Sequence, residues 1–172
     1  QFAEFMPYLK TRNHALMSKN LAARLPTPEA FLADGKRTVV VVKGYKHGRF
    51  FEQWLEGLRA QRRVVEVGSF DAALRVLRAG RADLMLTEPI NLQQAKKGGA
   101  WLEQTRLLDW APNEQVYGAL IVSRQRVAEA DRARLRQALR AMLSDGSMDA
   151  ILRRHVGEAV ARSMRVDPQE LR

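Results

Sequence analysis

The chain has no cysteine among its 172 residues, and this absence removes several kinds of chemistry. Disulfides, a thiol nucleophile and a cysteine-ligated metal site are excluded, while the cellular compartment is left open. Histidine is almost as scarce, with His14, His47 and His155 far apart along the chain. We expect each histidine to be a surface or structural residue, so the sequence predicts no metal site.

Two further absences bear on function. No stretch approaches the ~20 consecutive apolar residues that a membrane-spanning helix needs. No Ser-His-Asp set, paired-carboxylate arrangement or glycine-rich phosphate loop is recognisable. The sequence therefore predicts a chain without a transmembrane segment, without catalytic residues and without a cofactor.

Positive charge is abundant, with 29 lysines and arginines against 19 acidic residues and a net charge of +10. Such an excess has two interpretations, a nucleic-acid or anionic-surface binder, or an arginine-rich composition that places arginine on solvated faces. The arginines are spread along the chain, and Arg132, Arg136 and Arg140 form a stripe beside the apolar face of one predicted helix. No nucleic-acid motif and no interleaving of basic with aromatic residues is present, so we favour solvated faces.

The order of predicted elements indicates an α/β fold. Hydrophobic residues make up 46% of the chain, enough for a core in one domain or two small lobes. The β-branched run at 38–42 predicts a buried strand. The next helix places Phe51, Trp54, Leu55 and Leu58 on one apolar face, and a strand at 64–67 follows it. A second helix and a strand at 83–87 complete a succession that implies parallel pairing with right-handed crossovers.

The segment from 69 to 89 is the most informative part of the chain. Ser69 can cap a helix over 70–79, and Gly80 suits the position just after its end. The helix is amphipathic, because its apolar residues recur at helical spacing: Phe70, Ala73, Leu74 and Leu77. Glu88 then follows the strand at its carboxyl end, the edge at which ligands bind in open α/β sheets.

The rest of the chain predicts further short elements and a helical end. We expect a helix at 91–97, a strand at 105–109 and a long helix at 129–144 that is broken by Asp145-Gly146. Ser147 is the expected cap of the following helix, and Asp167 begins another. Inward-facing positions on the last two long helices are Leu135, Ala138, Leu139, Met142, Leu143, Met148, Ile151, Leu152 and Val156.

These pieces together resemble the type 2 periplasmic solute-binding proteins, in particular bacterial extracellular solute-binding protein family 3, whose members bind amino acids. The helix-strand unit that carries the resemblance contains Ala73-Leu74, Gly80-Arg81, Asp83 and Glu88. Phe5-Met6-Pro7-Tyr8, Tyr117-Gly118 and the run from Leu143 to Gly157 resemble other stretches of that family in the same order. The resemblance covers nearly the whole chain.

The resemblance implies a type 2 lobe, a mostly parallel sheet flanked by helices, with C-terminal helices that return to the other lobe. Residues 1–13 would be the end of lobe 1 and residues 14–122 would be lobe 2. Hinge crossover strands would lie near 14–18 and 116–122, and the helices of 123–172 would pack toward lobe 1. Most of lobe 1 would precede Gln1, so we expect a fragment of a longer protein.

A ligand site is expected at two loops of lobe 2. Backbone N–H groups of the Gly44-Tyr45-Lys46 loop, between a strand and a helix, can bind an anion. In the family this loop holds a ligand carboxylate, but only Gly44 matches the family pattern, so the alternative is a solvated loop. The resemblance implies that Glu88 pairs with a ligand ammonium group, with Thr87 adding a hydroxyl contact. The alternative for Glu88 is a surface turn before Pro89.

Four other side chains are candidates for the core or for the ligand site. Asn91 is a weaker ligand candidate and a better candidate for a helix N-cap. Trp54 is expected in the core. Trp101 and Trp110 are either partly buried or exposed to a ligand cleft.

The resemblance implies a binding module, not an enzyme. It would capture a small polar solute, an amino acid or related carboxylate, for the membrane subunits of an ABC transporter, in the periplasm or on the extracellular face of the membrane. Alternatives are the ligand-sensing domain of a membrane sensor, or a dehydratase-like enzyme that would need an acid or base beyond Glu88. The effector-binding lobes of a transcription regulator are a further alternative, which a DNA-binding motif upstream of Gln1 would favour.

Overall fold

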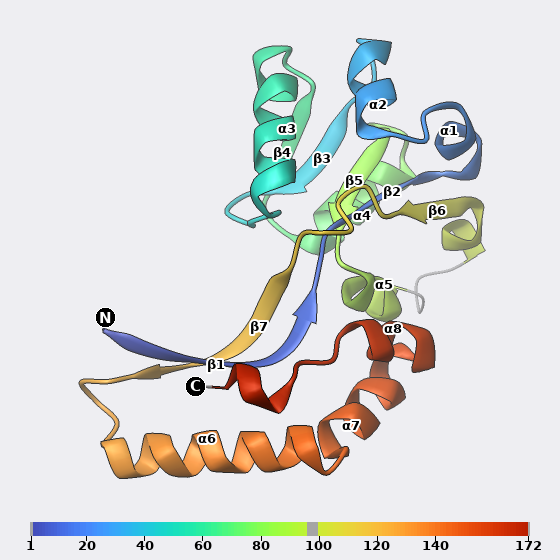
Figure 1. The fold of residues 1–172 in the computed structure, drawn as a ribbon. Helices are drawn as coiled ribbons and strands as arrows, with labels where there is room; N and C mark the ends of the chain where they lie inside the picture. Colours follow the sequence, from blue (N-terminus) through green and yellow to red (C-terminus); the bar gives the residue numbers. More distant parts are fainter. Residues whose placement is uncertain (1, 96–99, 172) are drawn as a thin grey trace. The chain divides into compact units, whose positions relative to one another are not determined.

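The computed structural model describes residues 2–95 and 100–171 (Figure 1). The chain divides into two compact units. One comprises Arg12–Glu114 and is called the sheet unit below. The other comprises Gln1–Thr11 and Gln115–Arg172 and is called the ribbon unit.

The sheet unit is built on a five-stranded sheet in the order β4-β3-β5-β2-β6. Its strands are β2 (His14–Ser18), β3 (Val39–Val42), β4 (Val64–Val67), β5 (Leu84–Thr87) and β6 (Thr105–Leu108). Its helices are α1 (Lys19–Arg24), α2 (Pro28–Asp34), α3 (Arg49–Ala60), α4 (Phe70–Arg78), α5 (Pro89–Ala95) and the 3₁₀ helix η2 (Ala100–Gln104). The predicted α/β fold is therefore confirmed. The predicted end of α5 at Lys97 lies outside the described residues.

The strands run mostly in one direction, with one exception. β3 pairs in parallel with β4 and β5, as the strand-helix-strand pattern predicts. β2 runs antiparallel to both β5 and β6. Because β2 enters the sheet between these two strands, only two of the four pairings are parallel.

Both faces of this sheet are buried, which is why its strands read as continuous apolar runs. Successive residues of β3 alternate between the faces, so Val39 and Val41 join one core and Val40 and Val42 join the other. The first core includes the buried side chains of α3, namely Phe51, Trp54, Leu55 and Leu58. The second core is covered by α4 through its apolar face, Phe70, Ala73, Leu74 and Leu77.

The ends of α4 follow the sequence prediction. The Ser69 side chain accepts a hydrogen bond from the backbone N–H of Ala72 at 3.2 Å. Gly80 has φ +66°, the left-handed conformation that favours glycine after a helix. β5 then begins at Leu84, and all four of its residues are buried.

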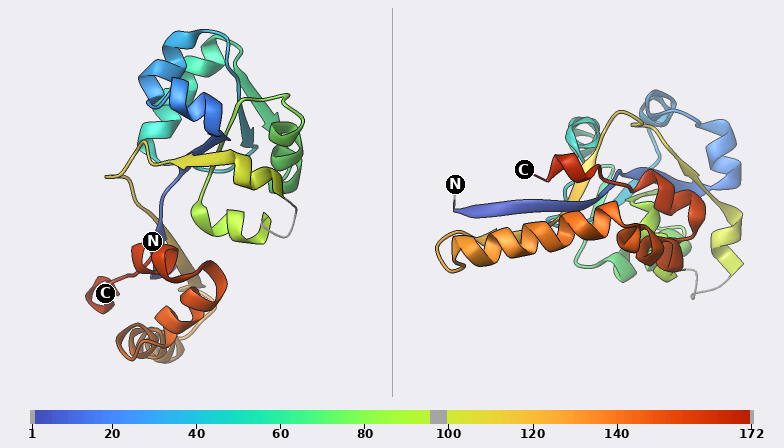
Figure 2. Two further views of the ribbon diagram at one scale, coloured as in Figure 1. Left: turned by 90° about the vertical axis from the view of Figure 1, so that its right-hand side faces the viewer. Right: turned by 60° about the horizontal axis from the view of Figure 1, so that its bottom comes forward.

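The ribbon unit is built on two long antiparallel strands, β1 (Ala3–Thr11) and β7 (Val116–Ser123). Both views of Figure 2 show them as neighbouring ribbons. Its helices are α6 (Glu129–Ser144), α7 (Ser147–Val156), α8 (Glu158–Ser163) and the 3₁₀ helix η3 (Pro168–Glu170). Pairing shifts register between Pro7 and Leu9, where proline lacks the N–H that a ladder hydrogen bond needs.

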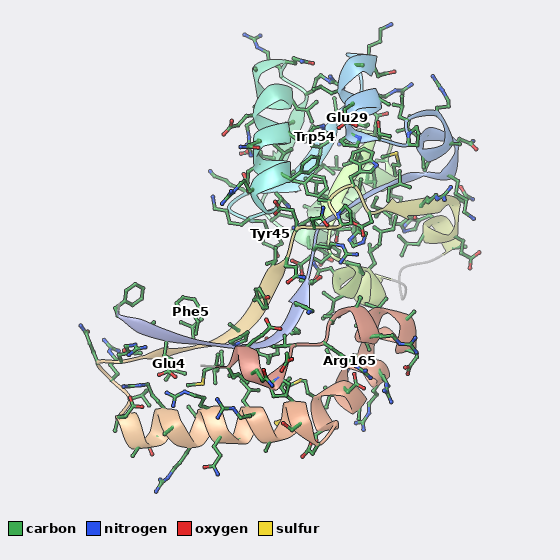
Figure 3. The ribbon with its side chains drawn as sticks, viewed as in Figure 1. Glu4, Phe5, Glu29, Tyr45, Trp54 and Arg165 are labelled. Atoms are coloured by element: carbon green, nitrogen blue, oxygen red, sulfur yellow. The ribbon has the colours of Figure 1, made fainter. Side chains whose placement is uncertain are left out.

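An ion-pair network replaces the predicted solvated stripe of arginines on α6. Glu4 of β1 is 5% exposed and accepts hydrogen bonds from Arg132 at 3.1 Å and Arg136 at 2.8 Å (Figure 3). The hydrogen bond from Arg136 holds the pKa of the Glu4 carboxyl below its usual value. Arg140 donates to the carbonyl oxygen of Leu171. The prediction was wrong because its pattern left out an acid 128 residues away that makes this face a buried one.

Helix positions near this network also differ from the prediction. Leu135 and Ile151 are each 40% exposed, and Ala138 is exposed. Ser147 is the first residue of α7, and the N-cap position belongs to Gly146, with φ +83°. The rest of the inward assignment is confirmed, because Leu139 and Leu143 pack against the core of this unit and Leu152 and Val156 are buried.

The boundaries of the two units lie close to the boundaries expected for the lobes. The chain passes between the units at 11–12 and at 114–115. The segment 14–18 is a strand inside the five-stranded sheet, and 116–122 pairs with β1. The helices after 123 belong to the same unit as β1. The assignment of lobes and hinges stays a prediction.

None of the described helices is long and apolar enough to cross a membrane.

Candidate functional site

A pocket of about 260 Å³ lies at the carboxyl ends of β3 and β5. Ligand pockets commonly measure ~300–1,000 Å³, so this one suits a small solute. Four of the five predicted site residues line it, from the loops after β3 and β5. The lining comprises Asn13, Val42, Tyr45, Lys46, Phe70, Met85, Leu86, Thr87, Glu88 and Asn91.

The loop after β3 turns sharply and presents Tyr45 and Lys46 to the pocket. Gly44 does not line the pocket, but its φ of +84° lets the chain turn there. The N–H of Tyr45 donates to the carbonyl of Val42 at 3.1 Å, which closes the turn. Tyr45 is 53% exposed, and Figure 3 labels it on this loop. Its ring is therefore available for a ligand to stack on.

Glu88 places a carboxyl group in the pocket. Its side chain is half-buried, and burial raises the pKa of its carboxyl above the usual value. Within the described part of the chain, no cation pairs with it, and burial is the one cause of its pKa shift. A half-buried carboxylate without a partner is costly, so this position favours a bound cation.

Thr87 and Asn91 flank this carboxylate. Thr87 is 3% exposed, and its hydroxyl donates to the carbonyl of Glu88 at 3.3 Å. The Thr87 hydroxyl proton is therefore already used. α5 begins at Pro89, so Asn91 lies in the first turn of the helix and the predicted N-cap role is wrong. Its backbone N–H donates to the carbonyl of Glu88 at 3.1 Å.

A buried pair beside the pocket had no sequence signal. Asn13 and His47 are each 4% exposed, and the His47 Nδ1 lies 3.1 Å from the Asn13 Oδ1. Burial lowers the pKa of the His47 imidazole, so the neutral ring donates from Nδ1 to the amide oxygen. The backbone N–H of His47 donates to Glu52 at 3.1 Å. The Asn13 Nδ2 and the His47 Nε2 have no hydrogen-bond partner in the structure, which is unusual for buried polar atoms.

No sequence pattern joins Asn13 and His47, which are 34 residues apart. They meet because β2 enters the sheet beside β5 and the loop after β3 ends at the same edge. His47 has the structural role expected of it. His14 is half-buried with its Nδ1 3.0 Å from the carbonyl of Arg12, and His155 is exposed.

The tryptophans divide between core and surface. Trp54 is 9% exposed, and its ring centroid lies 5.6 Å from that of Phe31, so its predicted core position is confirmed. Trp110 also contacts this cluster, and its Nε1 donates to the carbonyl of Pro26 at 2.7 Å. Trp110 is therefore no cleft aromatic. Trp101 is half-buried and lines a different pocket, on the opposite edge of the sheet.

The pocket thus combines an exposed lysine, an aromatic ring and a carboxylate that has no cation partner within residues 2–95 and 100–171. Glu88 can bind an ammonium group and Lys46 a carboxylate, while Tyr45 can cover the body of a solute. Over residues 2–95 and 100–171, no three His, Asp or Glu side chains are grouped to hold a metal ion.

Comparison with known proteins identifies the fold. No family model and no curated protein matches the sequence. Among solved structures, an ancestral arginine-binding protein bound to glutamine is 20% identical with a TM-score of 0.67, over 91% of this chain and 64% of that one. A structure from Streptococcus mutans, described for glutathione import via GshT and the cystine ABC importer TcyBC, is 12% identical with a TM-score of 0.71, over 98% and 67%.

A third match is the ancestral amino-acid-binding protein AncCDT-1, described as a precursor of cyclohexadienyl dehydratase. It is 18% identical with a TM-score of 0.66, over 90% of this chain and 62% of that one. The chain therefore spans about two thirds or less of the length of these structures. At these identities the likeness shows a shared fold, that of type 2 periplasmic binding proteins.

Proposed function

We propose that this chain is the solute-binding part of a periplasmic binding protein, which captures a small polar solute for an ABC transporter. The observation that carries the proposal is the half-buried Glu88 carboxylate, which pairs with no cation among the described residues and lies in the same pocket as Lys46. An amino acid carries the two complementary charges, an ammonium for Glu88 and a carboxylate for Lys46. A related carboxylate with a basic group would fit equally well.

The matched structures support this class of ligand. Their descriptions name arginine, glutamine, glutathione and amino-acid binding. All of these solutes bear both an ammonium and a carboxylate. The size of the pocket and the charges that line it agree with such solutes.

Capture by two lobes would require movement about the two segments where the chain passes between units, 11–12 and 114–115. We propose that solute binding closes the protein there, and that the closed form docks on the membrane subunits of the transporter. This role places the protein in the periplasm or on the extracellular face of the membrane. A sensor would use the same pocket and closure, with its signal passing to a membrane helix.

An enzymatic role is the second candidate, and one observation favours it. A carboxyl whose pKa is raised by burial, in a pocket, is the kind of group that acts as an acid or base. The likeness to a dehydratase precursor agrees with that reading. In the described lining Glu88 is the only carboxyl group, and the other ionisable side chains, Tyr45 and Lys46, are exposed to solvent. Binding therefore remains the stronger proposal.

A thermal-shift screen tests the binding proposal. A solute that binds only the folded protein raises its melting temperature. We expect a selective rise with one or a few amino acids from a panel of amino acids, glutathione, polyamines and small organic acids. The rise should disappear in Glu88→Gln and persist in Glu56→Gln, an exposed glutamate of the same unit.

Two outcomes would contradict the binding proposal. One is a rise that Glu88→Gln leaves unchanged, which would place the ligand elsewhere. The other is chemical conversion of a bound cyclic amino acid, followed by NMR of the solute, which would establish the enzymatic alternative.

A further inference from the structure

A second pocket, of about 370 Å³, opens at the amino ends of β3 and β5, the sheet edge opposite the solute pocket. Arg37 precedes β3, and Ala82 and Asp83 precede β5, so both strands begin beside it. Its lining comprises Ser18, Asn20, Leu21, Arg24, Arg37, Leu77, Arg78, Gly80, Ala82, Asp83, Trp101, Gln104 and Thr105. We call this the arginine pocket.

Three arginines line the arginine pocket, but they differ in how they are paired. Arg37 donates to Asp83 at 2.8 Å and lies 3.6 Å from Asp34, so its charge is already balanced. Arg24 and Arg78 are exposed, and neither forms an ion pair within the described residues. The positive charge available to a ligand therefore comes from Arg24 and Arg78.

Stabilisation of helix C-termini also explains the positions of these two arginines. Each lies in the last turn of its helix, α1 or α4, where a cation is favoured by the helix dipole. A helix C-terminus carries about half a negative charge. Each end therefore offsets about half of the positive charge of its own arginine, so helix stabilisation accounts for part of the positive charge that Arg24 and Arg78 bring to the pocket.

The rest of the arginine pocket suits a flat apolar group. Leu21 and Ala82 are buried, at 8% and 3% exposure, and form an apolar floor with Leu77. The half-buried Trp101 lies on the same pocket, and its indole N–H has no acceptor among the described residues. An aromatic wall whose N–H has no acceptor within the described part of the chain suits a planar body that carries an acceptor.

We infer that the arginine pocket binds a small organic anion with a flat apolar body, such as an aromatic carboxylate or an aryl phosphate. Arg24 and Arg78 bind the anionic group by charge-assisted hydrogen bonds, and Trp101 stacks on the body. This site is separate from the proposed solute pocket, because the two share no lining residue. An occupant would contact the starts of the strands whose ends carry Tyr45 and Glu88.

The test is a ¹⁵N-NMR titration of the 172-residue chain with four probes. 1-Naphthoate carries a carboxylate on a flat aromatic body, and phenyl phosphate carries a phosphate on a flat aromatic body. 1-Naphthalenemethanol is flat without charge, and inorganic phosphate is charged without a body. We expect the first two to bind and to shift the Trp101 indole resonance, with the last two at least about tenfold weaker.

Two double variants isolate the role of the arginines. Arg24→Gln/Arg78→Gln removes the charges that line the pocket and should weaken both flat anions by about tenfold or more. Arg49→Gln/Arg75→Gln removes the same net charge from exposed arginines of the same unit that do not line the pocket. Arg75 also lies in the last turn of α4 and so matches the helix-dipole effect of Arg78, whereas Arg49 begins α3 and matches Arg24 in charge alone. It should leave the affinities unchanged.

Trp101→Leu supplies an independent variant should the arginine variant fold poorly, and it should also weaken both flat anions. Equal affinities in the two double variants would overturn the inference, as would equal binding of the neutral probe. Equal affinities for inorganic phosphate and phenyl phosphate would contradict the claim that the pocket recognises a flat apolar body. Shifts confined to residues 44–46 and 87–88 would assign these probes to the solute pocket instead.

Discussion

At the scale of single residues, the molecule is defined by which polar groups lack partners. Glu4 is buried but receives hydrogen bonds from two arginines. Among the described residues, the half-buried Glu88 has no cation partner and the buried amide nitrogen of Asn13 has no acceptor. A satisfied buried charge is structural, whereas unsatisfied groups around one pocket point to a ligand.

The first prediction concerns the pH dependence at Glu88. Burial raises the pKa of Glu88 above 4.5, and an ammonium ligand binds its ionised form. Affinity should therefore fall as pH decreases through the raised pKa, and calorimetric titrations across this range would measure it. The free protein should behave in the opposite way, its free energy of unfolding decreasing as pH rises through the same pKa. In Glu88→Gln binding should be lost at every pH, and the contribution of Glu88 to the pH dependence of unfolding should disappear, while Glu56→Gln should keep both behaviours.

The second prediction concerns the buried pair. Asn13→Asp would place a carboxylate beside the Nδ1 of His47 and should raise the pKa of that imidazole, which burial now lowers. An NMR titration of the His47 ring measures the change, with Asn20→Asp, at an exposed position, as the control. Native stability should then persist to lower pH, since a lowered histidine pKa costs stability as pH falls through it. An unchanged pKa in Asn13→Asp would contradict the contact.

At the scale of elements, the sheet unit follows from local rules. The four valines of β3 are buried on both faces, and the ends of α4 are formed by Ser69 and Gly80. Such signals depend on neighbouring residues, so a sequence states them directly. The site was predictable to the same extent, because a carboxylate after β5 and a loop after β3 must meet at one sheet edge.

Long-range partners account for what the sequence did not predict. The direction of β2 depends on its pairing with β5, almost 70 residues later, and the Asn13–His47 contact depends on that pairing. Arg132 is buried only because Glu4 faces it. Periodicity alone assigns an arginine to solvent, so the burial of Arg132 was not predicted, whereas the inward positions of Leu139 and Leu143 were.

The third prediction concerns the N-terminal cap of α4. Ser69→Ala removes the side chain that accepts from Ala72 and should lower the free energy of unfolding by about 1 kcal/mol. Ser69→Asp supplies another acceptor and should retain most of the stability. Chemical denaturation followed by circular dichroism compares the three proteins. Equal stability of wild type and Ser69→Ala would show that the cap contributes nothing.

At the scale of the whole molecule, the ribbon unit exposes apolar surface. Phe5 and Ile121 are paired across β1 and β7, at 52% and 61% exposure (Figure 3). Phe2 is 76% exposed, and the chain spans 62–67% of the length of the matched structures. Contiguous exposed apolar residues of this kind favour association.

The fourth prediction follows from that surface. The 172-residue chain should associate as its concentration rises, and Phe5→Lys/Ile121→Lys should reduce this association. Leu135→Lys, at an exposed leucine of α6, is the matched control and should not. Sedimentation velocity over a range of concentrations measures all three. A wild-type chain that stays monomeric throughout would contradict the prediction.

The central claim is that the pocket at the carboxyl ends of β3 and β5 binds a solute through Glu88. The most direct measurement is a ¹⁵N-NMR titration with the amino acid that gives the largest thermal shift, in wild type, Glu88→Gln and Glu56→Gln. The account predicts saturable shifts at residues 44–46 and 87–88 in wild type and Glu56→Gln, and loss of binding in Glu88→Gln. Saturable shifts that avoid both loops, or that persist unchanged in Glu88→Gln, would contradict it.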